Sequence, residues 1–385
     1  MQAIRLLIAL HINLQFDREA FLGIARDAGT YGNVVLHMKH PAEDYKTAAA
    51  AIDAHAVIVT TGGREEVDEV AALGLPSVNM ANYLDAHALL PVVGNDDIAI
   101  GERAAAQYID AGFKHFAYLA DATNSYFFPR RDGFVGAVRA AGFECHIAPP
   151  LKERDNAGND RASLSTALAA RWLQSLPKPL GLFCAYDGYA REAINACKLA
   201  DLQVPEAVSV IGVDDDPILC MSMSPQIASI PTSAAEIGRR ALELALALSR
   251  GEKRPPEPLL IPPGEIVLRE SCVGRAIDDD DVAAAVNFIR VHVRERLTVA
   301  AVANAIAVSR RTLERKFHEV LQRSPNDEIR LARIAHAKRL LAETDLDLTE
   351  VARRSGMIRA QRLANLLKQD CGFTPMQYRN RSSRG

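Results

Sequence analysis

The chain has 385 residues, of which 49% are hydrophobic and 24% charged, enough for two or three packed domains. No apolar run approaches the roughly 18 residues of a membrane span, which excludes a membrane-spanning class. Residues 281–385 carry 20 Lys and Arg against 11 Asp and Glu, a balance of +9. The other residues carry 25 against 37, a balance of −12, and the sum is the −3 of the whole chain. A polyanion is therefore expected to bind only the C-terminal part.

Strands and helices alternate over the first 280 residues. We expect strands at residues 4–12, 34–38, 56–60, 77–80, 115–119, 144–147, 180–185 and 208–213. Helices are expected between them, the first at residues 17–28 with Asp17 as its N-cap. This rhythm predicts parallel sheets in an α/β fold. The strands are too many for one small sheet, so we expect two similar lobes.

Polar side chains gather where these strands end. They are His11, Asn13, Gln15, Asp96, Asp97, Asp121, Asp187, Asp214 and Asp215, and Arg130 opens a helix nearby. Ligands of open α/β sheets bind beyond the carboxyl ends of the strands. Carboxylates, amides and an arginine in one cleft suit a neutral polyol, whose hydroxyls need both acceptors and donors.

Each of these positions also has a structural interpretation. A single Asp after a strand is more often a helix N-cap than a ligand, by about two to one. The acidic run at 214–216 could bind a metal, but it has no His or Cys partner at ligand spacing. Gly62-Gly63 lacks the spacing of a dinucleotide or phosphate loop, and neither GxSxG nor HExxH occurs. The sequence predicts no catalytic residue, no cofactor and no metal.

The cysteines and the N-terminus indicate the compartment. Six cysteines show no CxxC and no metal-ligand spacing, so we expect buried free thiols. The chain starts almost directly on a strand, without a basic region followed by an apolar one. We expect a cytoplasmic protein.

The segment from residue 4 to residue 271 resembles the effector domain of LacI-type repressors, which is similar to periplasmic sugar-binding proteins. The motifs that carry this resemblance are Val93-Gly94-Asn95-Asp96-Asp97, Arg130-Arg131-Asp132-Gly133-Phe134, Tyr186-Asp187, Val204-Pro205-Glu206, the run VSVIGVDD at 208–215, and Ile237-Gly238-Arg239. The resemblance implies two lobes with a sugar between them. It also implies effector contacts at Asn13, Asp96, Arg130, Asp187 and Asp214. Tyr186 stands where that family usually has Asn, which implies a changed sugar preference.

Two short helices are predicted within residues 302–317, with a turn at Ala307-Val308 and Ser309 as N-cap of the second helix. On that second helix Leu313 and Phe317 face inward. The outer face carries Arg310, Arg311, Glu314, Arg315 and His318. A helix of this kind fits a DNA major groove, although it could also be an ordinary amphipathic helix.

A second copy of the pattern favours the DNA-binding interpretation. Residues 348–357 repeat the first helix and turn, and residues 359–371 follow as a second helix with Leu363 and Leu367 inward. A long helix is expected at 326–342 between the copies, where Ile329, Ile334, Ala337, Leu340 and Leu341 can pack on both. Two groove-sized helices on one spacer could enter successive major grooves about 34 Å apart.

Residues 281–379 resemble the DNA-binding domain of the AraC family, which has two helix-turn-helix units joined by a central helix. The closing signature reads Gly372-Phe373-Thr374-Pro375 followed by Tyr378-Arg379. The resemblance implies DNA contacts at Arg310, Arg311, Glu314 and Arg315 in the first unit, and at Arg359, Gln361, Arg362 and Asn365 in the second. Ala307 stands where the family usually has Gly, so a left-handed turn there would cost about 1–2 kcal/mol. Asn365 replaces a frequent Arg.

The combination of both domains, with Phe16-Asp17-Arg18 after the first strand, resembles the xylose-operon activators of bacteria. It implies a sugar-binding domain at 1–272, a linker at 273–280 and a double helix-turn-helix domain at 281–385. It further implies a homodimeric regulator that binds duplex DNA and D-xylose, with RNA polymerase as a further partner. A regulator that senses another sugar, a sugar-processing enzyme with a DNA-binding tail, and a scaffold whose tail binds protein are the alternatives.

Overall fold

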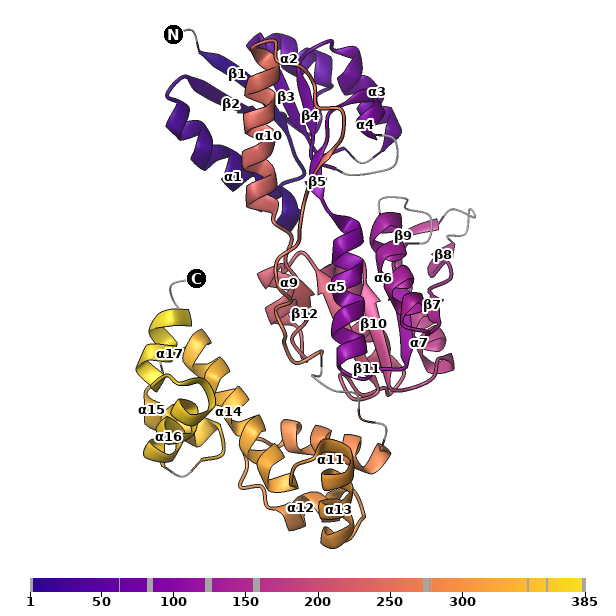
Figure 1. Ribbon diagram of the computed structural model, residues 1–385, viewed down its shortest axis with the longest axis vertical. Coiled ribbons are helices and arrows are strands. Elements are labelled where there is room, and N and C mark those ends of the chain that lie inside the picture. The colour runs from indigo at the N-terminus through magenta and orange to yellow at the C-terminus, as the bar shows by residue number, and fades with distance from the viewer. Residues whose placement is uncertain are drawn as a thin grey trace. The chain divides into compact units, whose positions relative to one another are not determined.

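The computed structural model describes residues 3–61, 63–81, 86–121, 127–154, 160–272, 277, 279–344, 346–357 and 359–382. Gly62 and much of the expected linker, residues 273–276 and 278, lie outside the described residues. The chain forms two compact units, Met1–Arg275 and Ala276–Gly385 (Figure 1).

The first sheet of the N-terminal unit has four parallel strands. Their order is β2 (Val34–Met38), β1 (Ile4–Ala9), β3 (Ala56–Val59) and β4 (Ser77–Asn79). Helices α1 (Gln15–Tyr31), α2 (Tyr45–Ile52), α3 (Arg64–Ala72) and α4 (Ala86–Leu89) follow these strands in turn, and α10 (Ala234–Ser249) comes back from later in the chain. Alternate side chains of β1 point to opposite faces. Leu6 and Ile8 pack under α1 and α10, while Leu7 packs under α2 and α3.

The second sheet has five parallel strands. Their order is β12 (Ala228–Ile230), β11 (Val208–Val213), β10 (Leu180–Cys184), β6 (His115–Leu119) and β7 (Cys145–Ile147). Its helices are α5 (Asp97–Asp110), α6 (Phe128–Ala140), α7 (Thr166–Ser175), α8 (Asp187–Leu199) and α9 (Pro217–Ser222). A parallel pair, β5 (Val93–Asn95) with β13 (Leu259–Ile261), and an antiparallel pair, β8 (Lys152–Arg154) with β9 (Asp160–Leu164), complete the unit. The two sheets confirm the expected two-lobed α/β fold.

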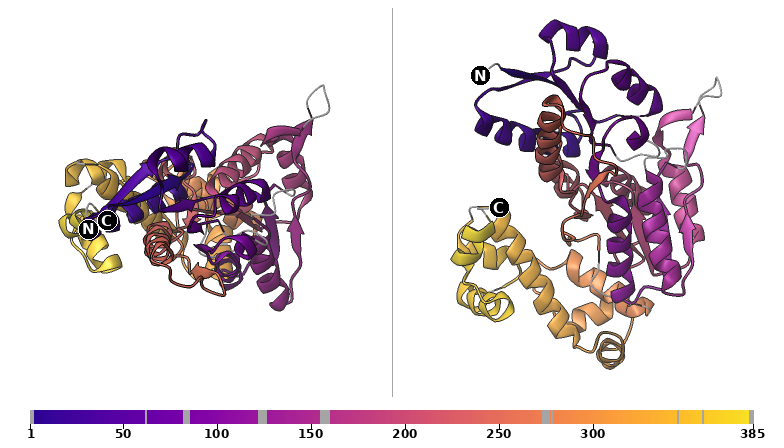
Figure 2. Two further views of the ribbon diagram at one scale, coloured as in Figure 1. Left: turned by 90° about the horizontal axis from the view of Figure 1, so that it is seen from above. Right: turned by 45° about the horizontal axis from the view of Figure 1, so that its top comes forward.

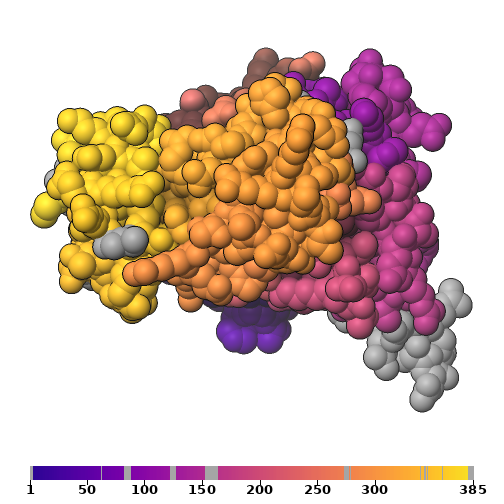
Figure 3. All heavy atoms as spheres, turned by 90° about the horizontal axis from the view of Figure 1, so that it is seen from below, coloured from indigo at the N-terminus to yellow at the C-terminus, as the bar shows by residue number. Residues whose placement is uncertain are grey.

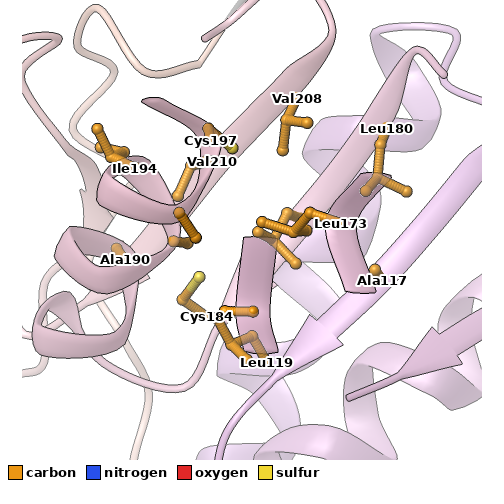
Figure 4. Close-up of a cluster of buried hydrophobic side chains, with 14 of the residues drawn as sticks. Ala117, Leu119, Leu173, Leu180, Cys184, Ala190, Ile194, Cys197, Val208 and Val210 are labelled. Carbon is orange, nitrogen blue, oxygen red and sulfur yellow. The ribbon is translucent and has the colours of Figure 1, made fainter. Parts of the chain in front are cut away.

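The second lobe has a continuous apolar core. Figure 4 shows Leu173 of α7 and Ile194 of α8 against side chains of β10 and β11. β10 and β11 are buried at every position, as expected for strands that are covered on both faces. The six cysteines are free, and Cys184 and Cys197 belong to this core.

Each lobe contains one close helix crossing that only glycine permits. In the first lobe α1 crosses α10 (Figures 1 and 2). A Cβ on Gly23 would lie 2.0 Å from the carbonyl oxygen of Ala235. In the second lobe α5 crosses α6, and a Cβ on Gly101 would lie 2.2 Å from the carbonyl oxygen of Arg130. The second crossing places the N-terminal turns of α5 and α6 side by side, and these turns carry Asp97 and Arg130.

All regular elements among the described residues of the C-terminal unit are helices. Its elements are α11 (Asp280–Val291), α12 (Val299–Ala305), α13 (Arg310–Leu321), α14 (Pro325–Glu343), α15 (Leu348–Arg354), α16 (Ala360–Cys371) and α17 (Pro375–Ser382). One apolar cluster joins α11, α12 and α13, and a second joins α15 and α16. As expected, α14 serves both, with Ile329 in the first cluster and Ile334, Ala337 and Leu341 in the second. Figure 3 shows the orange and yellow parts of this unit as one continuous surface.

The two helix-turn-helix turns differ in their surroundings. Ala307 has a φ of 57° and is exposed, so this alanine adopts the left-handed conformation that the sequence marked as unfavourable. Gly356 takes the same place in the second unit with a φ of 67°. A Cβ on Gly356 would lie 2.4 Å from the carbonyl oxygen of Val293. Nearby, Arg333 of α14 donates a 3.1 Å hydrogen bond to the carbonyl oxygen of Glu295. The second turn is thus packed against the segment between α11 and α12, which belongs to the first helix-turn-helix unit.

One expected helix cap is wrong. Asp17 does not cap α1, because the helix begins at Gln15 and the Asp17 carboxylate is fully buried. That carboxylate accepts hydrogen bonds from the backbone N–H of His11, at 2.6 Å, and from the hydroxyl of Thr60, at 2.8 Å. β1 ends at Ala9, where its pairing with β3 stops, and the hydrogen bond from His11 holds the loop that follows. In the C-terminal unit Asp279 caps α11, and its side chain accepts a hydrogen bond from the backbone N–H of Val282.

Candidate functional site

The centre of the second lobe's site is a buried arginine. Arg130 is 2% exposed, at the start of α6. Its Nε donates a 3.0 Å hydrogen bond to Oδ1 of Asp97, and its Nη2 donates to the same oxygen. Its Nη1 donates to the carbonyl oxygen of Ala185, directly after β10. A buried charge has to be paired, and this pair fixes the guanidinium between α5 and β10.

The partner carboxylate keeps one oxygen free. Asp97 is 1% exposed, and its Oδ2 has no hydrogen-bond partner among the described residues. Burial raises the pKa of Asp97, and the charge of Arg130 opposes this rise. Asp214 follows β11, which pairs with β10, so it stands at the same strand end as Ala185, the acceptor of the Arg130 hydrogen bond. Burial raises the pKa of Asp214 to about 6. Asp97 and Asp214 are therefore two carboxylates that can accept hydroxyl hydrogens beside one fixed guanidinium.

Asp187 lies in the same lobe, but its hydrogen bonds are made within the protein. It is 1% exposed, and the hydroxyl of Ser229 donates to its Oδ1 at 2.6 Å. The backbone N–H of Asp216 donates to its Oδ2 at 2.8 Å, and the thiol of Cys220 donates to the same oxygen at 3.3 Å. Burial, followed by the charge of Asp214, raises its pKa. Because both oxygens are engaged, Asp187 holds the loop of Asp214–Asp216 in place.

The remaining expected effector residues are more peripheral. Asp96 is the N-cap of α5, and its Oδ1 accepts from the backbone N–H of Ala99 at 3.0 Å. Asn13 is exposed, and its backbone carbonyl accepts from Arg18 at 2.9 Å. The expected capping role of an Asp after a strand therefore applies to Asp96, while the neighbouring Asp97 pairs with Arg130. Sequence reasoning named Asp97 but did not select it, because only the helix crossing reveals its partner.

A polar chain links the two lobes of the N-terminal unit. Arg18 of α1 lies 3.4 Å from Oδ2 of Asp216, which caps α9 in the other lobe. Arg18 also donates to the backbone carbonyls of Ile12 and Asn13. Through the backbone N–H of Asp216 this chain reaches Asp187. Sequence reasoning missed the role of Arg18, for which Phe16-Asp17-Arg18 was the only signal.

The face of α13 that is expected to contact DNA, its reading face, is exposed. Two of its arginines are paired with glutamates of the same helix. Leu313 and Phe317 are fully buried, so the opposite face points to solvent. There Nε of Arg310 lies 2.8 Å from Glu314, and Nη1 of Arg315 lies 2.8 Å from Glu319. Arg311 is exposed and makes no ion pair within the described residues.

The reading face of α16 has another chemistry. Leu363 and Leu367 are fully buried, and the exposed face carries amides and arginines. Nε2 of Gln361 donates a 3.1 Å hydrogen bond to Oδ1 of Asn365. Arg362 makes no ion pair within the described residues, and Arg359 is the N-cap residue of the helix. The expected reading residues of each unit therefore share one helix face.

Comparisons with known proteins agree with this architecture. Residues 105–272 match a periplasmic binding protein-like domain, and residues 302–381 match a helix-turn-helix domain. The xylose operon regulatory protein of Haemophilus influenzae is 26% identical over 299 residues, which cover 77% of this chain and 76% of that protein. Its namesake in Escherichia coli K12 is 29% identical over 214 residues, 56% of this chain and 55% of that protein. The chain is a DNA-binding transcription regulator.

The fold of this regulator is also that of a solved structure. The xylose-binding transcription activator xylR is 22% identical, superposes with a TM-score of 0.81 and covers 99% of the regulator and 98% of that chain. A LacI transcriptional regulator from a Rhodococcus species covers 71% of the regulator with a TM-score of 0.57. The expected combination of a periplasmic-binding-protein-like domain with an AraC-type helix-turn-helix domain is confirmed. These relatives are regulators and not enzymes, in agreement with the expectation.

Two negative findings hold for the described residues. No helix among them is long and apolar enough to cross a membrane. No group of three or more His, Cys, Asp or Glu among them could hold a metal ion.

Proposed function

We propose that the regulator activates transcription in response to a monosaccharide, D-xylose, bound between the two lobes of its N-terminal unit. The observation that carries this proposal is the buried Arg130–Asp97 pair with its unpartnered oxygen, next to Asp214. A sugar hydroxyl needs an acceptor and a donor, and this arrangement supplies carboxylate oxygens beside a fixed guanidinium. The names of the relatives from two bacteria support xylose as the sugar.

The residues have separate roles in this proposal. Asp97 and Asp214 accept sugar O–H groups, and Arg130 donates. Asp187 positions the loop that carries Asp214, since its own oxygens are engaged. Asp96 and Asn13 border the site from the start of α5 and the loop after β1.

The lobes then transmit the signal. The Arg18–Asp216 ion pair joins them at the loop that Asp187 holds, so a sugar that moves this loop also moves α1. We propose that the regulator works as a cytoplasmic homodimer whose reading helices bind operator half-sites and recruit RNA polymerase. Sugar binding shifts the population of lobe arrangements and so changes how the dimer binds DNA.

Calorimetric titration of the full chain with D-xylose, L-arabinose, D-ribose and D-glucose tests the sensor. We expect saturable binding of D-xylose and a loss of more than tenfold for Asp214→Asn, because a carboxylate that accepts two hydroxyls is replaced by an amide. Asp215→Asn is the matched control, since Asp215 also has a positive φ but pairs with Arg269 at 2.7 Å. Preference for another of the four sugars would contradict xylose and keep the mechanism.

Binding to duplex DNA tests the output. We expect the affinity for a selected operator to fall steeply as salt rises, because Lys and Arg displace counterions from phosphates. Arg311→Ala should weaken binding by about 1–3 kcal/mol and relax specificity at one base position. An affinity that does not depend on salt would contradict the DNA-binding role of the reading helices.

A further inference from the structure

The second reading helix carries a pair of amides that hold each other in one orientation. Gln361 and Asn365 lie one turn apart on the exposed face of α16, and Nε2 of Gln361 donates to Oδ1 of Asn365 at 3.1 Å. The only acidic residue in α16 is Asp370, and its carboxylate lies 2.6 Å from Nζ of Lys338. No carboxylate of α16 is therefore close enough to compete for the amides.

This hydrogen bond decides which groups remain for a ligand. With one N–H of Gln361 and the oxygen of Asn365 engaged, Oε1 of Gln361 is left as an acceptor and Nδ2 of Asn365 as a donor. The pair thus offers an acceptor and a donor next to each other on a helix that fits the major groove. A partner must offer the complementary donor and acceptor.

Among the four bases only adenine has that pattern in the major groove. Its N6 amino group donates and its N7 accepts, whereas guanine presents two acceptors, thymine an acceptor and a methyl group, and cytosine a donor alone. We propose that the Gln361–Asn365 pair reads an adenine in the half-site bound by the second helix-turn-helix unit. The inference rests on the proposed function, because it needs α16 in a major groove.

The surroundings of the pair favour base contact over phosphate contact. Leu363 and Leu367 are fully buried and fix the roll of the helix, so both amides point away from the core. Arg362 lies between them in sequence and has no carboxylate partner within the described residues, which leaves it available for phosphate. In the first unit the places of Gln361 and Asn365 are taken by Arg311 and Arg315, so α13 has no amide pair at these two positions.

Selection of binding sites from a random duplex library tests the proposal. The full chain is used with D-xylose present, as wild type, Gln361→Ala, Asn365→Ala and Gln369→Ala. We expect one position of the wild-type site to require adenine, and both substitutions of the pair to remove that requirement. Gln369→Ala is the matched control, because Gln369 is an exposed amide two turns further along α16, and it should keep the requirement. Circular dichroism checks that the variants are folded.

A modified base separates the amide pair from general DNA binding. Replacing the required adenine with 7-deazaadenine removes the N7 acceptor, and wild-type affinity should fall about tenfold. Gln361→Ala should bind both duplexes equally. An unchanged wild-type affinity for the modified duplex, or an adenine requirement that survives Gln361→Ala, would overturn the inference and leave the regulatory function intact. A library from which the wild type enriches no duplex would overturn both.

Discussion

The site in the N-terminal unit and the exposed face of α13 both contain arginine–carboxylate ion pairs, but the first pair is buried and the others are exposed. In the N-terminal unit Arg130 is 2% exposed and its partner Asp97 is 1% exposed. On α13 the side chains of Arg310 and Arg315 are 66% and 60% exposed beside their glutamates. An exposed ion pair contributes about 0–1 kcal/mol, whereas breaking a buried pair costs about 3–5 kcal/mol.

This difference matches the ligands that the two regions are proposed to bind. A small sugar has to be selected by fixed hydrogen-bond geometry, so its site is part of the folded core. DNA offers many phosphates and base edges, and an arginine that exchanges a glutamate for a phosphate has to be movable. Substitutions in the buried site are therefore expected to lower the free energy of unfolding. Substitutions on the exposed faces of α13 and α16 are expected to change mainly the affinity for DNA.

The largest effect should follow from breaking the buried pair. Arg130→Met leaves the Asp97 carboxylate buried without its charge partner, and we expect the free energy of unfolding to fall by about 3–5 kcal/mol. Denaturant titration followed by circular dichroism reports on the helices of both units, and the fluorescence of Trp172, the single tryptophan, reports on the N-terminal unit. Arg315→Met is the matched control and should change stability by less than about 0.5 kcal/mol. Equal losses for both variants would remove the contrast between the two regions.

The two turns of the C-terminal unit repeat the contrast between packed and exposed positions. Gly356→Ala places a methyl group 2.4 Å from the carbonyl of Val293 in a left-handed turn. We expect a loss of about 3 kcal/mol, from roughly 1–2 for the conformation and the rest from overpacking. Hydrogen exchange of the amides of α15 and α16 measures it.

The opposite substitution, alanine to glycine, can be made at the corresponding turn of the first helix-turn-helix unit and compared with Gly356→Ala. Ala307→Gly relieves a left-handed alanine that is exposed, so it should stabilise the unit by up to about 1 kcal/mol. Ala301→Gly, at an exposed position inside α12, should instead destabilise it by about 1 kcal/mol. Stabilisation by Gly356→Ala would contradict the packing of the second turn.

The carboxyl group of Asp214 should also make the stability of the N-terminal unit depend on pH. The pKa of Asp214 is about 6 in the folded chain against its ordinary value of 3.8, so as pH rises the unfolded chain releases this proton first. The contribution of Asp214 is therefore fully present below about pH 3.8 and is lost as pH rises to about 6, by at most about 3 kcal/mol. Denaturant titrations between pH 4 and 7 should show a flatter dependence for Asp214→Asn. An unchanged slope would contradict the burial of this carboxyl group.

The smallest effect is expected on the exposed face of α13. Glu319→Gln removes the partner of Arg315 and frees it for phosphate, so DNA affinity should rise several-fold at low salt. Stability should change by less than about 0.5 kcal/mol. Glu343→Gln, at the C-terminal end of α14, is the control for the loss of a negative charge, and an equal gain in affinity there would indicate a general charge effect.

Much of the fold follows from local pattern. The strands β1–β4, β6, β7, β10 and β11, the two helix-turn-helix copies and the shared helix α14 were predicted, because apolar periodicity and caps such as Ser309 act over a few residues. The short strands β8, β9, β12 and β13 were not predicted. The strand end at Ala9 was not predicted either, since it depends on where the neighbouring strands β2 and β3 stop offering ladder partners. The sequence also did not single out Asp97, because neighbouring carboxylates look alike until a helix crossing assigns their partners.

The sequence by itself determined that this protein joins a two-lobed α/β domain to two DNA-reading helices, since periodicity, motif order and charge asymmetry are all encoded locally. The tertiary structure decided which polar groups are engaged and which are left for ligands. The crossing of α5 and α6 at Gly101 pairs Arg130 with Asp97, and the packing of the N-terminal unit brings Arg18 to Asp216. Hydrogen-bond partners depend on distances of about 3 Å, and such distances between residues far apart in the sequence arise only when the helices pack.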